Sequence, residues 1–115
     1  MSDVVDISRI RETSDGDTEF ELELIEMYLD DAQSHVDRLE AAVDAGDIAA
    51  IKQGSHTLKG SSANIGAIRM QEASFELEKC GRDGDAAAAV GLVAPLKEAF
   101  AATEIYFKDY LKTIS

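Results

Sequence analysis

Apolar residues recur three and four positions apart along nearly the whole chain, which is the spacing of one face of an α-helix. The clearest case is the stripe of Ile48, Ile51, Ser55, Leu58, Ser62 and Ile65, in which two serines take places in an otherwise apolar row. Pro95 is the only proline, so few positions oppose a helix. We therefore expect an all-α fold.

Short segments with glycine, serine and aspartate divide this pattern into separate helices. We expect a short amphipathic element at about 6–13, long helices at about 18–45, 48–65 and 67–79, a loop at 80–85 and a last helix at about 86–113. Thr18 and Glu21 have the spacing of a capping box, and Asp47 is a suitable N-cap for the next helix. Pro95 should bend the last helix or split off its first turns.

These elements predict one small domain. Four long helices joined by short connections favour an up-down-up-down antiparallel four-helix bundle, with the short N-terminal helix closing one end. A chain of 115 residues can bury one hydrophobic core but not two. Residues 1–115 should therefore form a single domain with its core at about 17–113.

The composition narrows the class of partner. The chain has 23 acidic and 11 basic residues and a formal net charge of −12, so nucleic acids and anionic membrane surfaces should repel it. No apolar stretch approaches the ~20 residues of a membrane span, and the N-terminus lacks the features of a signal peptide. The single cysteine, Cys80, cannot form an internal disulfide. We expect a cytoplasmic protein, and the high charge favours a monomer.

The segment from residue 48 to residue 71 differs from the rest of the chain because it contains three Lys or Arg but no Asp or Glu. A weakly basic segment in an acidic chain can tolerate an anion. Within it, Lys59 and Gly60 follow His56 by three and four positions, so all three share one helix face beside the buried stripe. The spacing thus groups an imidazole nucleophile, a fixed cation and a position without a side chain.

Other interpretations fit these residues less well. A histidine on a helix flank is usually only a solvated polar residue, but Lys59, Gly60 and the acid-free segment argue against that here. His35 lies in a helix full of Asp and Glu, and we expect it to be structural. The chain has no His-Glu-x-x-His spacing for a metal and no Gly-x-Ser-x-Gly elbow of a hydrolase. We expect no metal and no cofactor on this chain.

The run His56-Thr57-Leu58-Lys59-Gly60-Ser61-Ser62-Ala63-Asn64-Ile65-Gly66-Ala67 closely resembles the motif of histidine-containing phosphotransfer (HPt) domains from multistep two-component phosphorelays. Segment 18–47 is similar to the helix that precedes the phosphohistidine in that family, and segment 67–78 to the helix that follows it. The likeness covers about residues 7–112 and is strongest from 18 to 80.

The resemblance implies a role for each matching residue. His56 would be phosphorylated on its ring, Lys59 would neutralise the phosphoryl oxygens, and Gly60 would let the partner's active site dock. In the family the following helix often has a polar residue near the histidine. Glu78 falls near that place here but cannot donate a hydrogen bond to phosphate, so Gln53 is a candidate donor. The residues expected to dock the partner are Lys52, Gln53, Ala63, Ile7 and Ile10.

The mechanism that the resemblance implies is phosphoryl exchange between His56 and an aspartate of a receiver domain. Receivers of response regulators and of hybrid sensor kinases would be partners, with a histidine kinase as a further candidate. Neutral imidazole would attack phosphorus in line while the carboxylate leaves, and the receiver would supply Mg²⁺.

The chain has no Gly-rich nucleotide loop, so it would be a phosphocarrier without kinase activity. Two other interpretations stay open. One is a non-catalytic helical adaptor that binds a receiver or kinase without phosphotransfer. The other is the phosphorylatable domain of a larger hybrid or chemotaxis-type kinase.

Overall fold

The computed structural model describes residues 3–114. Within that range it contains the helices α1 (Ser8–Ser14), α2 (Thr18–Ala45), α3 (Ile48–Ile65), α4 (Ile68–Asp83), α5 (Ala86–Val90) and α6 (Val93–Ile114). The described residues form no strand, so the prediction of an all-helical chain is confirmed for this part of the protein.

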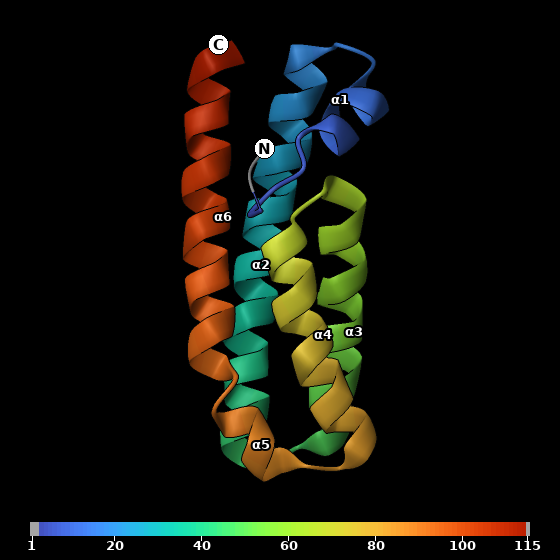
Figure 1. The fold of residues 1–115 in the computed structure, drawn as a ribbon, viewed down its shortest axis with the longest axis vertical. Coiled ribbons are helices and arrows are strands. Elements are labelled where there is room, and N and C mark those ends of the chain that lie inside the picture. Colours follow the sequence, from blue (N-terminus) through green and yellow to red (C-terminus); the bar gives the residue numbers. More distant parts are fainter. Residues whose placement is uncertain (1–2, 115) are drawn as a thin grey trace.

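Four long helices form the body of an elongated molecule that measures 43 × 23 × 20 Å. Along the chain, α2, α3, α4 and α6 run alternately in opposite directions (Figure 1). Helix α3 packs against α2 and α4, and α6 packs against the same two helices on the other side. The short helices lie at opposite ends, with α1 beside α2 and α3, and α5 where α2 and α4 come together (Figure 1).

All four long helices contribute to one hydrophobic core. Its largest side chains, each at most 1% exposed, include Ile25, Leu39, Ile51, Leu58, Met70, Leu77, Leu96 and Phe107. The two serines of the α3 stripe are also fully buried, as their spacing predicts. Ser55 Oγ donates to the Ile51 carbonyl, and Ser62 Oγ shares a hydrogen bond of 2.7 Å with the Tyr28 hydroxyl. Each of these two buried hydroxyl groups therefore has a partner, as burial requires.

Contrary to the expectation from the sequence, residues 86–114 are long and apolar enough, by length and composition, to cross a membrane. The largest apolar side chains of this segment, including Leu96, Phe100 and Phe107, are buried in the core. Lys97 on the outer face bonds Glu40 of α2. One face of α6 therefore packs into the core of the helical bundle.

Three predictions about helix boundaries can be compared with the structure. The capping-box prediction was wrong: Asp17 is the N-cap of α2 and accepts a hydrogen bond from the Phe20 amide, while Glu21 is buried. The expected loop at 80–85 was too long, because α4 continues to Asp83. The predicted split near Pro95 is confirmed: α5 ends at Val90, and Pro95 lies in the first turn of α6, where its missing N–H is tolerated.

Helices α3 and α4 make the most extensive contact of any helix pair among the described residues. At one end of this contact, Gly81 of α4 lies directly against the backbone of Lys52 in α3. A Cβ atom at Gly81 would lie 2.7 Å from Lys52 Cα and Cβ. Real Cβ atoms do not approach so closely, so only glycine allows this spacing of the two helices.

We predict that Gly81→Ala destabilises the protein, although alanine is the better helix former by roughly 0.5–1 kcal/mol. The added methyl group must push α4 away from α3, and overpacking of this kind costs about 1–3 kcal/mol. Urea denaturation would measure the change in the free energy of unfolding. Gly60→Ala is the matched control, because nothing lies within 4 Å of a Cβ there. A Gly81→Ala protein as stable as Gly60→Ala would contradict the packing argument.

Candidate functional site

His56 stands on the outer side of α3, next to the buried stripe. Its side chain is 69% exposed, whereas Ser55 and Leu58 beside it are fully buried. The helix is held from both sides by α2 and α4, so the histidine is presented to solvent from a rigid element. This outward position agrees with the spacing in the sequence.

Glu78 of α4 joins His56 and Lys59 through its two carboxylate oxygens. Oε2 lies 2.6 Å from His56 Nδ1, and Oε1 accepts a hydrogen bond of 2.6 Å from Lys59 Nζ. The Glu78 side chain is only 7% exposed, so both ends of the carboxylate are occupied and little of it faces water. Charge-assisted hydrogen bonds of this length are among the stronger ones in proteins.

The pKa of Glu78 is lowered, and the hydrogen bond from Lys59 is the main cause. Burial raises this pKa, and the hydrogen bond with His56 lowers it further. Glu78 is therefore ionised near neutral pH, and an ionised carboxylate only accepts hydrogen bonds. A neutral His56 ring must then carry its proton on Nδ1. The lone pair is left on Nε2, the nitrogen that is free to react.

Lys59 is held between Glu78 and an aromatic ring. Its Nζ atom lies 5.3 Å from the centroid of Phe75, within the range of a cation–π interaction. Lys79 and Arg82 approach the same ring at 5.0 and 5.7 Å. The Lys59 ammonium is thus fixed at the site on the same helix face as His56, rather than extended into solvent.

The neighbouring positions on α3 are open to solvent or nearly so. Gly60 is exposed, and nothing lies within 4 Å of a Cβ built on it, so the fold itself does not require glycine there. Lys52 is exposed and Ala63 is partly exposed. Gln53 is exposed too, but it lines a separate hollow between α2 and α3 that also contains His35. The hydrogen-bond partner of the His56 ring is Glu78.

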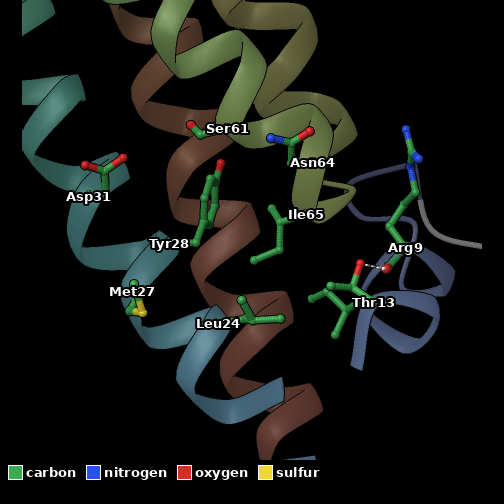
Figure 2. A pocket seen from close by; sticks show the side chains of 10 residues that line it. Arg9, Thr13, Leu24, Met27, Tyr28, Asp31, Ser61, Asn64 and Ile65 are labelled. Carbon is green, nitrogen blue, oxygen red and sulfur yellow. Dashed lines mark hydrogen bonds between the residues drawn. The ribbon is translucent and has the colours of Figure 1, made fainter. Parts of the chain in front are cut away.

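A groove of about 680 Å³ lies beside this site, between α1, α2 and α3 (Figure 2). The residues that line it include Arg9, Leu24, Met27, Asp31, Asn64 and Ile65. Met27 is an exposed apolar side chain, at 69%. Asn64 also lines the groove and lies eight residues after His56, about 12 Å along α3 and about 80° around it, so the groove and the histidine open on neighbouring sides of that helix.

Two residues expected to dock the partner are wholly or partly buried. Ile10 is buried at 1% exposure and supports the groove from beneath. Ile7 is partly buried against the core.

Sequence reasoning missed the role of Glu78 as an acceptor. A signal for it was present, since Glu78 follows Ser74 by four positions and therefore continues the buried side of α4. An acid in such a place needs a cationic or hydrogen-bonding partner, and His56 and Lys59 are the partners.

Comparison with known proteins assigns the family. Residues 23–106 match the family model described as the Hpt domain. The chain is 32% identical over 65 residues to the phosphorelay intermediate protein rdeA of Dictyostelium discoideum, covering 56% of this chain and 26% of that protein. It is 29% identical over 77 residues to histidine-containing phosphotransfer protein 5 of Arabidopsis thaliana, a match that covers 64% of this chain and 49% of that protein. The matches thus span about a quarter and about half of these relatives.

Solved structures give the same assignment. Histidine-containing phosphotransfer protein B (HptB) of Pseudomonas aeruginosa superposes with a TM-score of 0.91 at 26% identity, over 98% of both chains. Two further structures share the fold. A putative histidine-containing phosphotransfer protein from rice superposes with a TM-score of 0.85 at 19% identity, over 96% of this chain and 81% of that chain. The HPT domain of a Shewanella hybrid histidine kinase superposes with a TM-score of 0.80 at 20% identity, over 98% of this chain and 97% of that chain. The family model covers most of the chain, and it shows that the chain belongs to the Hpt domain family.

Proposed function

We propose that this chain is a histidine phosphocarrier of a two-component phosphorelay, without kinase activity of its own. In this proposal His56 exchanges a phosphoryl group with aspartates of receiver domains. The observation that carries it is the 2.6 Å contact between His56 Nδ1 and Glu78 Oε2, which leaves Nε2 as the nucleophile on an exposed ring. Membership of the Hpt family and the likeness to a phosphorelay intermediate support it.

The chemistry follows from this tautomer. The Nε2 lone pair attacks the phosphorus of an aspartyl phosphate, the N–P bond forms, and the bond from phosphorus to the carboxylate oxygen breaks. The aspartate leaves with the electron pair, and the His56 ring becomes a cation that keeps its proton on Nδ1. The Glu78 carboxylate stabilises that cation, and the reverse reaction passes the group to another receiver.

Cations must offset the charge of the phosphoryl group, because its transition state is loose and anionic. Lys59 supplies one from this chain, and its place between Glu78 and Phe75 keeps it near His56. The described residues contain no group of three or more His, Cys, Asp or Glu that could hold a metal ion. We infer that the receiver brings the Mg²⁺.

Receiver docking is expected over Gly60, where no side chain stands in the way, and along the adjacent groove. Lys52 and Ala63 lie near His56 on α3. Ile10 and Ile7 act indirectly, because they pack α1 against the hydrophobic core. The scaffold for this surface is an antiparallel four-helix bundle closed at one end by α1. We propose that residues 1–115 form one such domain, monomeric and cytoplasmic.

The first test uses an isolated receiver domain labelled with radioactive phosphate, in Mg²⁺, and compares wild type with His56→Gln. We predict acid-labile, base-stable label on wild type only. Because the His56 side chain is mostly exposed, the variant should keep the wild-type circular dichroism spectrum and unfolding midpoint. A wild-type protein that binds receivers without becoming labelled would instead support the adaptor interpretation.

Glu78→Gln should slow phosphoryl acceptance by about ten-fold or more, because an amide can donate to Nδ1 and favour the unreactive tautomer. The ring ¹⁵N chemical shifts of His56 would report the tautomer directly. Glu76→Gln is the control, since Glu76 lies on the same helix and bonds Lys79 rather than His56. Unchanged shifts and an unchanged rate in Glu78→Gln would remove Glu78 from the mechanism.

Gly60→Leu should block transfer from a receiver while leaving the domain at least as stable as wild type, since leucine is the better helix former. Phosphoramidate, a donor small enough to need no docking surface, should still phosphorylate His56 in this variant. Transfer from the receiver at the wild-type rate would show that close approach at Gly60 is not needed.

A further inference from the structure

A second buried carboxylate lies far along the chain from the His56 site. Glu21 of α2 is only 2% exposed, and each of its oxygens accepts a hydrogen bond from a hydroxyl group. Ser14 Oγ of α1 donates to Oε2 at 2.7 Å, and the Tyr110 hydroxyl of α6 donates to Oε1 at 2.5 Å. The guanidinium of Arg11 lies 5.8 Å from the centroid of the Tyr110 ring. This network ties three helices together.

Helix α1 depends on such ties. It has seven residues, and isolated helices shorter than about 12–15 residues are marginal in water. Its N-cap residue, Ile7, offers no side-chain hydrogen bond. The N-terminal end is held where the Asp6 amide donates to the Gly66 carbonyl, at 2.7 Å. At the other end, Ser14 reaches Glu21.

The same helix forms one wall of the groove. Arg9, Ile10 and Thr13 line the groove from α1, and Figure 2 shows Arg9 and Thr13 opposite Tyr28 and Leu24 of α2. Thr13 directly precedes Ser14. A shift of Ser14 away from Glu21 would therefore move the α1 wall relative to the α2 and α3 walls.

We propose that Glu21, together with Ser14 and Tyr110, positions α1 so that the groove is shaped to dock the receiver. The inference rests on the proposed function and adds to it a set of recognition residues that do not touch the reacting atoms. A buried carboxylate that loses a hydrogen-bond donor must regain one from water. The short α1 is the element that can move to admit water, because few contacts hold it.

Removing a donor should thus weaken docking and leave the chemistry at His56 unchanged. The test is Tyr110→Phe, which keeps the ring in the core and deletes only the hydroxyl. Tyr106→Phe, one turn earlier on α6, is the matched control because the hydroxyl donors of Glu21 are Ser14 and Tyr110. Three quantities are measured: amide hydrogen exchange in residues 8–14, the KM and kcat for transfer from a phosphorylated receiver domain, and the rate of labelling by phosphoramidate.

For Tyr110→Phe we expect faster exchange in α1 and a KM for the receiver raised on the order of three- to ten-fold. The kcat and the phosphoramidate rate should stay at wild-type values, as befits a loss of docking affinity. Tyr106→Phe should match wild type in all three. Ser14→Ala, which removes the other donor, should reproduce the Tyr110→Phe result and replaces it if that protein does not fold.

Two outcomes would overturn the inference. Unchanged exchange in α1 would show that the network does not hold this helix, and faster exchange with an unchanged KM would show that α1 does not take part in docking. Either result leaves phosphotransfer by wild type intact. A wild-type protein that accepts no phosphoryl group from a receiver or from phosphoramidate would instead remove the proposed function, and this inference with it.

Discussion

The site depends on one carboxylate, Glu78, that is buried beside a histidine and a lysine. The ion pair with Lys59 and the hydrogen bond to His56 keep it charged despite burial, and a charged Glu78 fixes the proton of His56 on Nδ1. That arrangement needs α3 and α4 to lie close together. Gly81, one turn beyond Glu78, provides the close contact by packing against the backbone of Lys52, one turn before His56. The close packing of α3 against α4 therefore also determines which ring nitrogen of His56 is left free.

The distribution of charge is compatible with the proposed acceptance of a phosphoryl group by an acidic chain. The chain carries a formal net charge of −12, but the α3 segment around His56 contains no Asp or Glu. Glu78 enters the site from another helix, and both of its oxygens already accept hydrogen bonds. It therefore presents little free negative charge to an incoming phosphoryl group. When the ring becomes cationic, the same carboxylate lies in direct contact with the new charge, where attraction is stronger than across water.

The sequence was sufficient to predict the helices and the outward face of α3, because both follow from local periodicity. The position of His56 beside Lys59 and Gly60 needs only the geometry of one helix. The contact with Glu78 crosses two helices and depends on how closely α4 packs, which spacing along the chain does not encode. Glu21 was misassigned to a capping box for the same reason: its donors, Ser14 and Tyr110, come from other helices. Asp17 also lies one position earlier and competes better for the N-cap.

The two buried carboxylates, Glu78 and Glu21, lie in different parts of the molecule and hold different helices together. Glu78 acts between α3 and α4 and fixes the ring proton of neutral His56 on Nδ1, whereas Glu21 accepts hydrogen bonds from α1 and α6. No hydrogen bond or ion pair in the described residues connects the two sets, so changes at one should leave the other largely unaffected. Substitutions around α1 could then alter which receiver docks without altering the reactive tautomer. In the proposed function the chain exchanges the same group with more than one receiver, and this separation would let docking affinity change while the chemistry at His56 stays fixed.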